Sequence, residues 1–286
     1  MGKYSLMSTI PMKWVKRNNL KSGDQINFVE VNNKLILSSE AEIFKKKIEV
    51  HISSTKVEVI WRVLQPIYTS GYDEAIITFT DKKTLKILER SLQSLIAFEI
   101  VETGENRIVI KSVAHHSDED FNAILRRTFL IFLNISEVFK EGLEKNKIKR
   151  LEEIRPLEIT VNKYTMFLKR LINRKGYKYP HYMYSIVTFL ELASNHFEYL
   201  RRYFSFNPKT KIEKEMIEDS RKLNDLINRT YDLNYKFSEK KFEKIAVDQP
   251  HFLWFKGIKN SEIKSNFKSI AEYIVQISRL IKANNM

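Results

Sequence analysis

Two pairs of polar side chains in the second half of the sequence have a spacing that brings oxygen atoms together. Glu158 and Asn162 stand four residues apart, and so do Glu191 and Asn195. Residues four apart share one side of a helix. Two carboxylates placed in this way can hold a hard cation, whereas an amide oxygen carries no net charge and attracts a cation less. The alternative is that Glu191 and Asn195 border an apolar stripe and hydrogen-bond between helices.

A second chemistry comes from the distribution of charge. The chain carries 49 Lys and Arg against 35 Asp and Glu, a formal net charge of +14. Residues 1–39 hold six basic and two acidic side chains, residues 40–113 hold eleven of each, and residues 114–286 hold 32 and 22. Such a balance is typical of partners of nucleic acids or other anionic surfaces. In the helical C-terminal part, the lysines are better interpreted as solvating the helices.

Several classes of protein are excluded by composition. The 286-residue chain has no cysteine, which removes disulfides, thiolate metal sites and cysteine nucleophiles. Its histidines form no HExxH spacing, and no phosphate loop, GxSxG elbow or dinucleotide fingerprint is present. We therefore expect no enzymatic activity and no cofactor. No apolar run approaches the roughly 18 residues of a spanning helix, so we expect a cytoplasmic protein without membrane insertion.

Three parts of the chain must position these residues. Residues 1–39 are predicted to form a β-α-β-β unit, with strands over 4–9, 25–31 and 34–38, a short helix opened by Pro11 and a turn at Asn32–Asn33. Residues 40–113 are predicted to form a small α/β connector, with strands over 48–52, 75–79, 98–102 and 107–111 and helices over 55–68 and 81–95. The first unit is too small to close a core alone, so we expect it to borrow core from a second copy.

The remaining part, 114–286, shows apolar residues at a period near 3.6, which predicts five or six long helices packed antiparallel. The predicted runs are 119–146, 156–174, 183–204, 210–246 and 259–283, with interruptions at Pro156, Pro180, Pro208 and Pro250. The expected fold class is therefore α+β: a β-rich N-terminal module, an α/β connector and a helical bundle.

The first thirty-nine residues resemble the AbrB-like (SpoVT/AbrB, swapped-hairpin) DNA-binding module. The resemblance rests on the segments Ser5–Pro11, Met12–Arg17, Leu20–Asp24 and Leu35–Leu37 around the Asn32–Asn33 turn. It implies that two chains interleave their strands into a homodimer that binds double-stranded DNA. The phosphate contacts that it implies are Lys3, Lys13, Lys16, Arg17 and Lys21.

The rest of the chain is similar to archaeal PhoU-like phosphate uptake regulators. The connector carries this similarity from Tyr68 to Asp73 and from Leu95 to Glu102, with Ala97 where glycine is common. In the helical part, the resemblance implies metal-binding motifs at positions Glu158, Asn162, Glu191 and Asn195, where both terminal carboxylates have become amides. We therefore expect the metal site to be degenerate.

Together these patterns favour a dimeric DNA-binding transcriptional regulator connected with phosphate uptake. The alternative is an adaptor that does not bind DNA: its N-terminal module dimerises the protein, and its helices contact a transporter or a signalling kinase.

Overall fold

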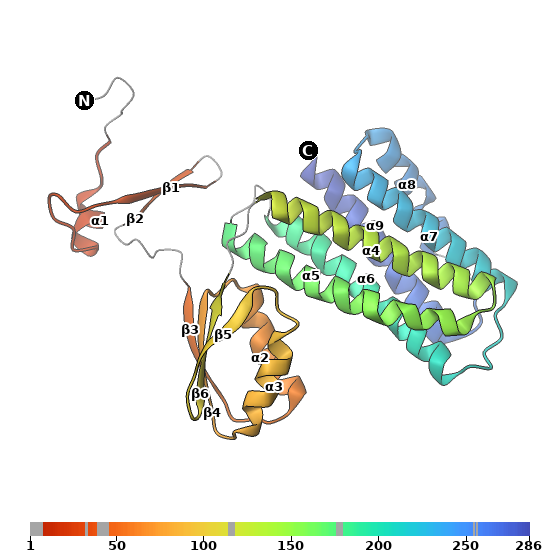
Figure 1. The fold of residues 1–286 in the computed structure, drawn as a ribbon. Coiled ribbons are helices and arrows are strands. Elements are labelled where there is room, and N and C mark those ends of the chain that lie inside the picture. Colours follow the sequence, from red (N-terminus) through yellow and green to blue (C-terminus); the bar gives the residue numbers. More distant parts are fainter. Residues whose placement is uncertain are drawn as a thin grey trace.

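The computed structural model describes residues 8–31, 34–38, 46–113, 118–175, 180–253, 255 and 257–286. It shows a two-stranded hairpin, a four-stranded sheet with two helices, and a region of long helices (Figure 1). This arrangement confirms the α+β class expected from the sequence.

The N-terminal part consists of α1 (Met12–Arg17), β1 (Asn27–Val31) and β2 (Lys34–Ser38). The two strands pair antiparallel, with Phe28 opposite Leu37. Residues 4–7 of the expected first strand and the Asn32–Asn33 turn lie outside the described residues, and Ser8 and Thr9 are not in a strand.

The connector forms a sheet whose strand order is β3-β4-β6-β5. Its elements are β3 (Lys47–Ile52), α2 (Val57–Thr69), β4 (Glu74–Phe79), α3 (Lys83–Leu92), β5 (Phe98–Thr103) and β6 (Arg107–Ser112). Strands β3 and β4 run parallel because α2 crosses between them, whereas β6 pairs antiparallel with both β4 and β5. Alternate residues of β4, namely Ala75, Ile77 and Phe79, are buried, and both helices lie on one face of the sheet (Figure 1).

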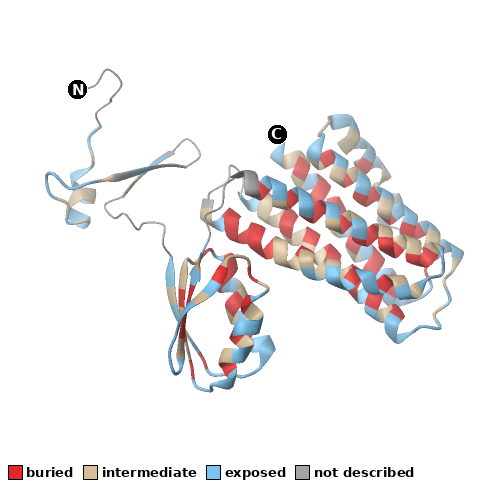
Figure 2. Cartoon of the chain, in the orientation of Figure 1, coloured by how far each residue is buried: buried red, intermediate tan, exposed pale blue. Residues whose placement is uncertain are grey.

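Long helices make up the remainder of the described chain, and the residues coloured as buried in Figure 2 lie along the sides where these helices face one another. They are α4 (Asp118–Glu144), the 3-10 helix η1 (Ile148–Glu153), α5 (Ile154–Lys175), α6 (Pro180–Phe206), α7 (Lys214–Tyr235), α8 (Glu239–Leu253) and α9 (Ser261–Asn284). Helix α6 packs between α5 and α9, and α4 packs against α5 and α7. Among the described residues, no helix is both long and apolar enough to cross a bilayer.

One predicted helix is wrong. The run 210–246 is not continuous, because α7 ends at Tyr235 and Lys236 leaves the helical region with φ −140° and ψ 62°. Ser238 then caps α8, accepting a hydrogen bond from the Lys241 amide at 3.3 Å. The expected interruption at Pro250 is also wrong, since α8 continues to Leu253.

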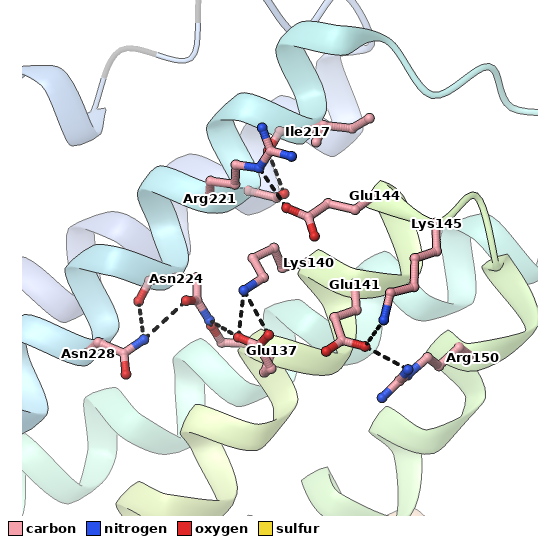
Figure 3. Close-up of polar contacts among 12 residues, drawn as sticks. Glu137, Lys140, Glu141, Glu144, Lys145, Arg150, Ile217, Arg221, Asn224 and Asn228 are labelled. Carbon is pink, nitrogen blue, oxygen red and sulfur yellow. Dashed lines mark hydrogen bonds and ion pairs between the residues drawn. The ribbon is translucent and has the colours of Figure 1, made fainter.

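Polar contacts join α4 to α7 (Figure 3). Arg221 Nε lies 2.6 Å from Glu144 Oε1, and Asn224 Nδ2 donates to the Ser136 hydroxyl at 2.7 Å and to Glu137 at 3.2 Å. Beyond the end of α4, Arg150 returns to Glu141 at 2.7 Å. These contacts fix how the two helices lie against each other.

The connector joins the helical part through polar side chains of α5. Arg170 donates to the Tyr68 carbonyl at 2.9 Å, and Asn173 donates to the Thr69 carbonyl at 2.8 Å. Both acceptors are at the C-terminus of α2, where helix carbonyls have no partners within the helix. Arg174 forms an ion pair of 2.6 Å with Asp73, just beyond that helix. The positively charged side chains thus lie at the negative end of the α2 dipole.

Candidate nucleic-acid interface and the polar contact between α5 and α6

The basic residues of the N-terminal part lie on a short helix. Pro11 precedes α1, and its carbonyl accepts the amides of Trp14 and Val15. Lys13, Lys16 and Arg17 are spaced i, i+3 and i+4, so they share one side of this helix. All three are exposed, and none forms an ion pair in the part of the chain that the structure describes.

Lys21 follows in a turn that reverses the chain. Its amide donates to the Asp24 carboxylate at 2.6 Å, and Gly23 adopts φ +94°. A residue with a side chain adopts this φ at a cost in energy, so glycine suits the position. Lys21 is exposed like the helix cations. Lys3, the fifth residue expected to contact DNA, lies outside the described residues.

The β1–β2 hairpin presents apolar side chains to solvent. Phe28 is 60% exposed and Leu35 is 65% exposed. They share one face, because Phe28 is opposite Leu37 and Leu35 is two residues from Leu37. A two-stranded hairpin is marginal in water without further packing. This exposed apolar face would therefore be stabilised by packing against another apolar surface.

The two Glu and Asn pairs meet where α5 packs on α6. Asn162 donates to the Glu158 carboxylate on its own helix, and its amide lies 3.4 Å from Asn195 Oδ1 on α6. Thr165 donates to Glu191 Oε2 at 3.2 Å. The structure thus places all four positions at one interhelical contact, and Glu191 and Asn195 form the hydrogen bonds between helices that the sequence analysis gave as the alternative to metal binding.

A cation already occupies part of this contact. The Lys169 ammonium lies 2.6 Å from Glu191 Oε2, and the residue is only 7% exposed. It neutralises the one carboxylate that α6 contributes to the motif positions, and a metal ion would have to displace it. Among the described residues, no group of three or more His, Cys, Asp or Glu side chains is arranged to hold a metal ion. The residues present do not fit the metal cluster that the PhoU resemblance implies.

Burial and the neighbouring Glu198 carboxylate raise the pKa of Glu158, which favours its neutral form. Burial opposes ionisation of Glu198 as well, but hydrogen bonds from Arg201 and Arg202 outweigh that effect and lower its pKa. Arg201 donates to Glu198 at 2.7 and 2.8 Å, and Arg155 lies 3.2 Å away. The pKa values of the two carboxylates are therefore shifted in opposite directions because the two groups have different partners.

Sequence reasoning missed Lys169 and Arg170. They form a Lys-Arg pair within the apolar run 166–172, whose other members are all buried. Two adjacent cations in such a run cannot both reach solvent, and that signal was available in the sequence. The structure uses Lys169 toward α6 and Arg170 toward the connector.

The comparisons with known proteins concern only the start of the chain. Residues 5–44 match the family model described as "Antidote-toxin recognition MazE, bacterial antitoxin". This match supports the AbrB-like character of the N-terminal module. No curated protein and no solved structure matches the chain.

Proposed function

We propose that this protein is a dimeric DNA-binding regulator whose N-terminal module contacts double-stranded DNA through Lys13, Lys16, Arg17 and Lys21. The observation that carries the proposal is the exposed cationic side of α1, which has no acidic partner among the described residues. It lies within the segment that matches the antitoxin family model. When unpaired Lys and Arg side chains neutralise DNA phosphates, counterions are released from the DNA, and this release favours binding of the protein.

The proposal includes no enzymatic step and no cofactor. Phosphate contacts position a protein on DNA without selecting a base sequence. The connection with phosphate uptake rests on the resemblance of the connector and helices to PhoU-like proteins, and it is part of the proposal only on that basis.

An antitoxin-type function is the second candidate, because the matched family is described as a bacterial antitoxin. In that case the N-terminal module still dimerises, and another part of the chain binds a protein partner. The adaptor that contacts a transporter or kinase belongs to the same class. Binding of DNA whose affinity falls as the salt concentration rises would favour the regulator over the adaptor that does not bind DNA.

The test is fluorescence anisotropy of the full chain with a 30-base-pair duplex of mixed sequence over a series of salt concentrations. Each phosphate neutralised adds about −0.9 to the slope of log affinity against log salt. Lys16→Glu with Arg17→Glu should reduce the magnitude of this slope and abolish binding at physiological salt.

The matched control is Lys83→Glu with Lys86→Glu, which makes the same change in net charge on exposed positions of α3. If both double variants weaken binding equally, only the overall charge matters. If Lys16→Glu with Arg17→Glu leaves the salt slope unchanged, α1 is not the DNA-binding element.

A further inference from the structure

A pocket lies at the end of the helical part that is remote from the connector. It has a volume of about 380 Å³ and lies between the last turns of α6 and the first turns of α9. Helix α5 contacts the connector through Arg170, near its C-terminus. Helix α6 runs antiparallel to α5, since Thr165 meets Glu191 and Arg155 meets Glu198, so the end of α6 lies far from that attachment (Figure 1). The pocket and α1 share no residues.

The pocket lining contains aromatic rings that are open to solvent. Phe206 is 83% exposed and Tyr199 is 49% exposed, and Tyr203 lies between them in the lining. The spacing i, i+4 and i+7 places the three residues on one side of α6. Covering exposed aromatic surface is favourable because it removes apolar area from water. These rings are therefore available to a ligand.

Arg202 brings positive charge to the same side of α6 and also lines the pocket. Its Nε donates to Glu198 at 3.0 Å, and its side chain is 53% exposed. Arg155 and Arg201 pair with Glu198 as well, and Arg201 also reaches Glu152, so three guanidinium groups are paired with only two carboxylates. Arg202 thus shares its one partner with two other arginines, and its terminal amino groups can bind an anion.

Exposed lysines add to the positive charge at this end of the helices. Lys209 and Lys211 lie in the loop after α6, and neither forms an ion pair within the part of the chain that the structure describes. Lys259 is 86% exposed and lies 3.6 Å from Glu213. Among the described lining residues, the one carboxylate is Glu262, in the first turn of α9, where the helix dipole offsets negative charge. The surroundings of the pocket therefore favour an anionic ligand.

The side chains beneath the exposed rings are held in place. Asn260 donates to the Tyr203 hydroxyl at 2.7 Å. His196 Nδ1 lies 2.7 Å from Asn266 Oδ1, and the His196 ring packs edge-on against Tyr199 with 5.4 Å between ring centres. Side chains fixed in this way lose little conformational entropy when a ligand binds, which favours affinity.

We propose that this side of α6 binds single-stranded nucleic acid. Its bases stack on Tyr199 and Phe206, and its phosphates pair with Arg202, Lys209 and Lys211. The two aromatic residues are seven positions apart, about 10 Å along the helix axis, which leaves each ring free for a separate base. In a duplex the faces of the bases are covered by their neighbours, so only an unpaired strand can stack on these rings.

An acidic peptide would also pair with the cations, but it would not use the flat faces of two exposed rings. The proposal goes beyond the proposed function, because this site lies apart from α1. One molecule could then hold a duplex through α1 and a single strand through the end of α6.

The experiment is fluorescence anisotropy of the full chain carrying Lys16→Glu with Arg17→Glu, so that α1 does not contribute. The probes are a 12-nucleotide thymidine strand, a uridine strand of the same length and an abasic strand with the same phosphates. The thymidine or the uridine strand should bind at least tenfold more tightly than the abasic strand, and the tighter of the two identifies DNA or RNA as the ligand.

Two results of this experiment would overturn the proposal. Equal binding of all three strands would mean that the bases do not contribute. Loss of the thymidine and uridine complexes in the α1 variant, when the unmodified protein forms them, would place the single strand on α1. A 12-residue polyglutamate that competes as well as the thymidine strand would likewise refute it, because the site would then select negative charge alone.

Variants of α6 test the aromatic rings. Tyr199→Ala with Phe206→Ala should weaken binding of the thymidine strand at least tenfold and leave binding of the abasic strand unchanged. Phe206→Trp keeps a flat ring and should retain the affinity. Leu130→Ala, at a residue of α4 that is 46% exposed, is the control and should bind as the parent protein does. A Tyr199→Ala, Phe206→Ala protein that is folded by circular dichroism and still prefers thymidine to abasic strands would contradict the assignment.

Arg202→Met tests the phosphate contact. It should reduce the magnitude of the slope of log affinity against log salt by about 0.7, the contribution of one phosphate in a single strand. Arg221→Met is the matched control, because Arg221 is 60% exposed and pairs with a single glutamate on α4. Equal changes in slope for the two variants would remove Arg202 from the site.

Discussion

The ammonium group of Lys169 compensates the charge of Glu191 between two packed helices. Removing one partner of a buried ion pair leaves an uncompensated charge, which typically costs about 3 kcal/mol or more. We expect Lys169→Met to lower the free energy of unfolding by about 3 kcal/mol, measured by urea denaturation at pH 7.

The matched control is Lys268→Met, at an exposed lysine 3.7 Å from Glu272 on the surface of α9. Exposed pairs of this kind contribute at most about 0.5 kcal/mol. Equal losses for the two variants would mean that Lys169 contributes through its hydrocarbon chain and that the charge of Glu191 is solvated.

Glu158 gives a pH-dependent prediction. Its pKa is raised above the ordinary value of 4.5 by burial and by Glu198, so its ionised form destabilises the folded state. This cost is complete above the folded pKa and disappears as the pH falls below the ordinary value. Glu158→Gln removes the charge and keeps an acceptor for Asn162, so it should raise the melting temperature at pH 7 and have no such effect at pH 3.5.

Glu153→Gln provides the comparison for Glu158, since its carboxylate is 59% exposed and lies 3.9 Å from Arg150. We expect the melting temperature of Glu153→Gln to equal that of the unmodified protein at both pH 7 and pH 3.5. A Glu158→Gln protein that is less stable at pH 7 would show that the carboxylate is ionised and held by Arg155 and Arg202, which lower its pKa.

The candidate site could be predicted only in part at this scale. The repeated Glu and Asn spacing identified four positions that do meet between α5 and α6. Thr165 and Lys169, four residues apart on α5, both bond to the same carboxylate oxygen of Glu191 on α6. The spacing of the Glu and Asn residues could not predict this contact of Lys169, because it depends on which helix packs against α5.

At the scale of elements, the turn that ends α2 carries the next prediction. Gly71 adopts φ +81°, and a Cβ at this position would lie 2.6 Å from Arg174 Cγ. Gly71→Ala should lower the free energy of unfolding by about 1–2 kcal/mol because of the left-handed backbone. It should also displace Arg174 from Asp73, to which it is now paired at 2.6 Å.

Gly104→Ala is the control, because Gly104 has neither a left-handed backbone nor a side chain in the place of its added Cβ. The nearest atom to its added Cβ is the Arg107 carbonyl oxygen, at 3.6 Å, and its φ is not in the left-handed range. Chemical denaturation of both variants should therefore show a clear loss only for Gly71→Ala. A similar loss at both positions would refute the role given to the Gly71 conformation.

Most elements of the connector were predictable because their boundaries coincide with strong local signals. The turn at Gly104, for example, closes β5 on β6 through a hydrogen bond of 2.7 Å from its amide to the Arg107 carbonyl. The break between α7 and α8 was missed because neither Gly nor Pro marks it, and Ser238 acts there as a helix cap. The opposite error occurred at Pro250: the proline predicted an interruption, but α8 continues through it to Leu253.

At the scale of the whole molecule, the sequence predicted which parts are β-rich and which are helical, and composition alone indicated the basic N-terminal part. How the parts attach was not predictable. It depends on Arg170, a guanidinium that is 2% exposed and donates to a carbonyl of another unit 102 residues away. Burial lowers the pKa of Arg170 to about 10, so it remains charged at neutral pH.

The last prediction concerns assembly through the N-terminal hairpin. Phe28 and Leu35 expose most of their apolar surface on one face, and burying such surface yields roughly 25 cal/mol per Å². A second copy of the hairpin supplies a matching face, which is also what the AbrB-like character of this segment leads us to expect. We therefore expect the full chain to be a dimer by light scattering, and Phe28→Glu with Leu35→Glu to convert it into a monomer.

Val101→Glu is the control for this change, because Val101 is 50% exposed on β5 and lies outside the hairpin. It should leave the dimer intact. If the charged hairpin variant remains dimeric, the helices or the connector assemble the protein instead. If the variant is instead monomeric, the DNA assay gives a second test. A monomer has half of the cationic contacts of the dimer. Its slope of log affinity against log salt should therefore fall to about half of the dimer value, since the slope scales with the number of phosphates contacted.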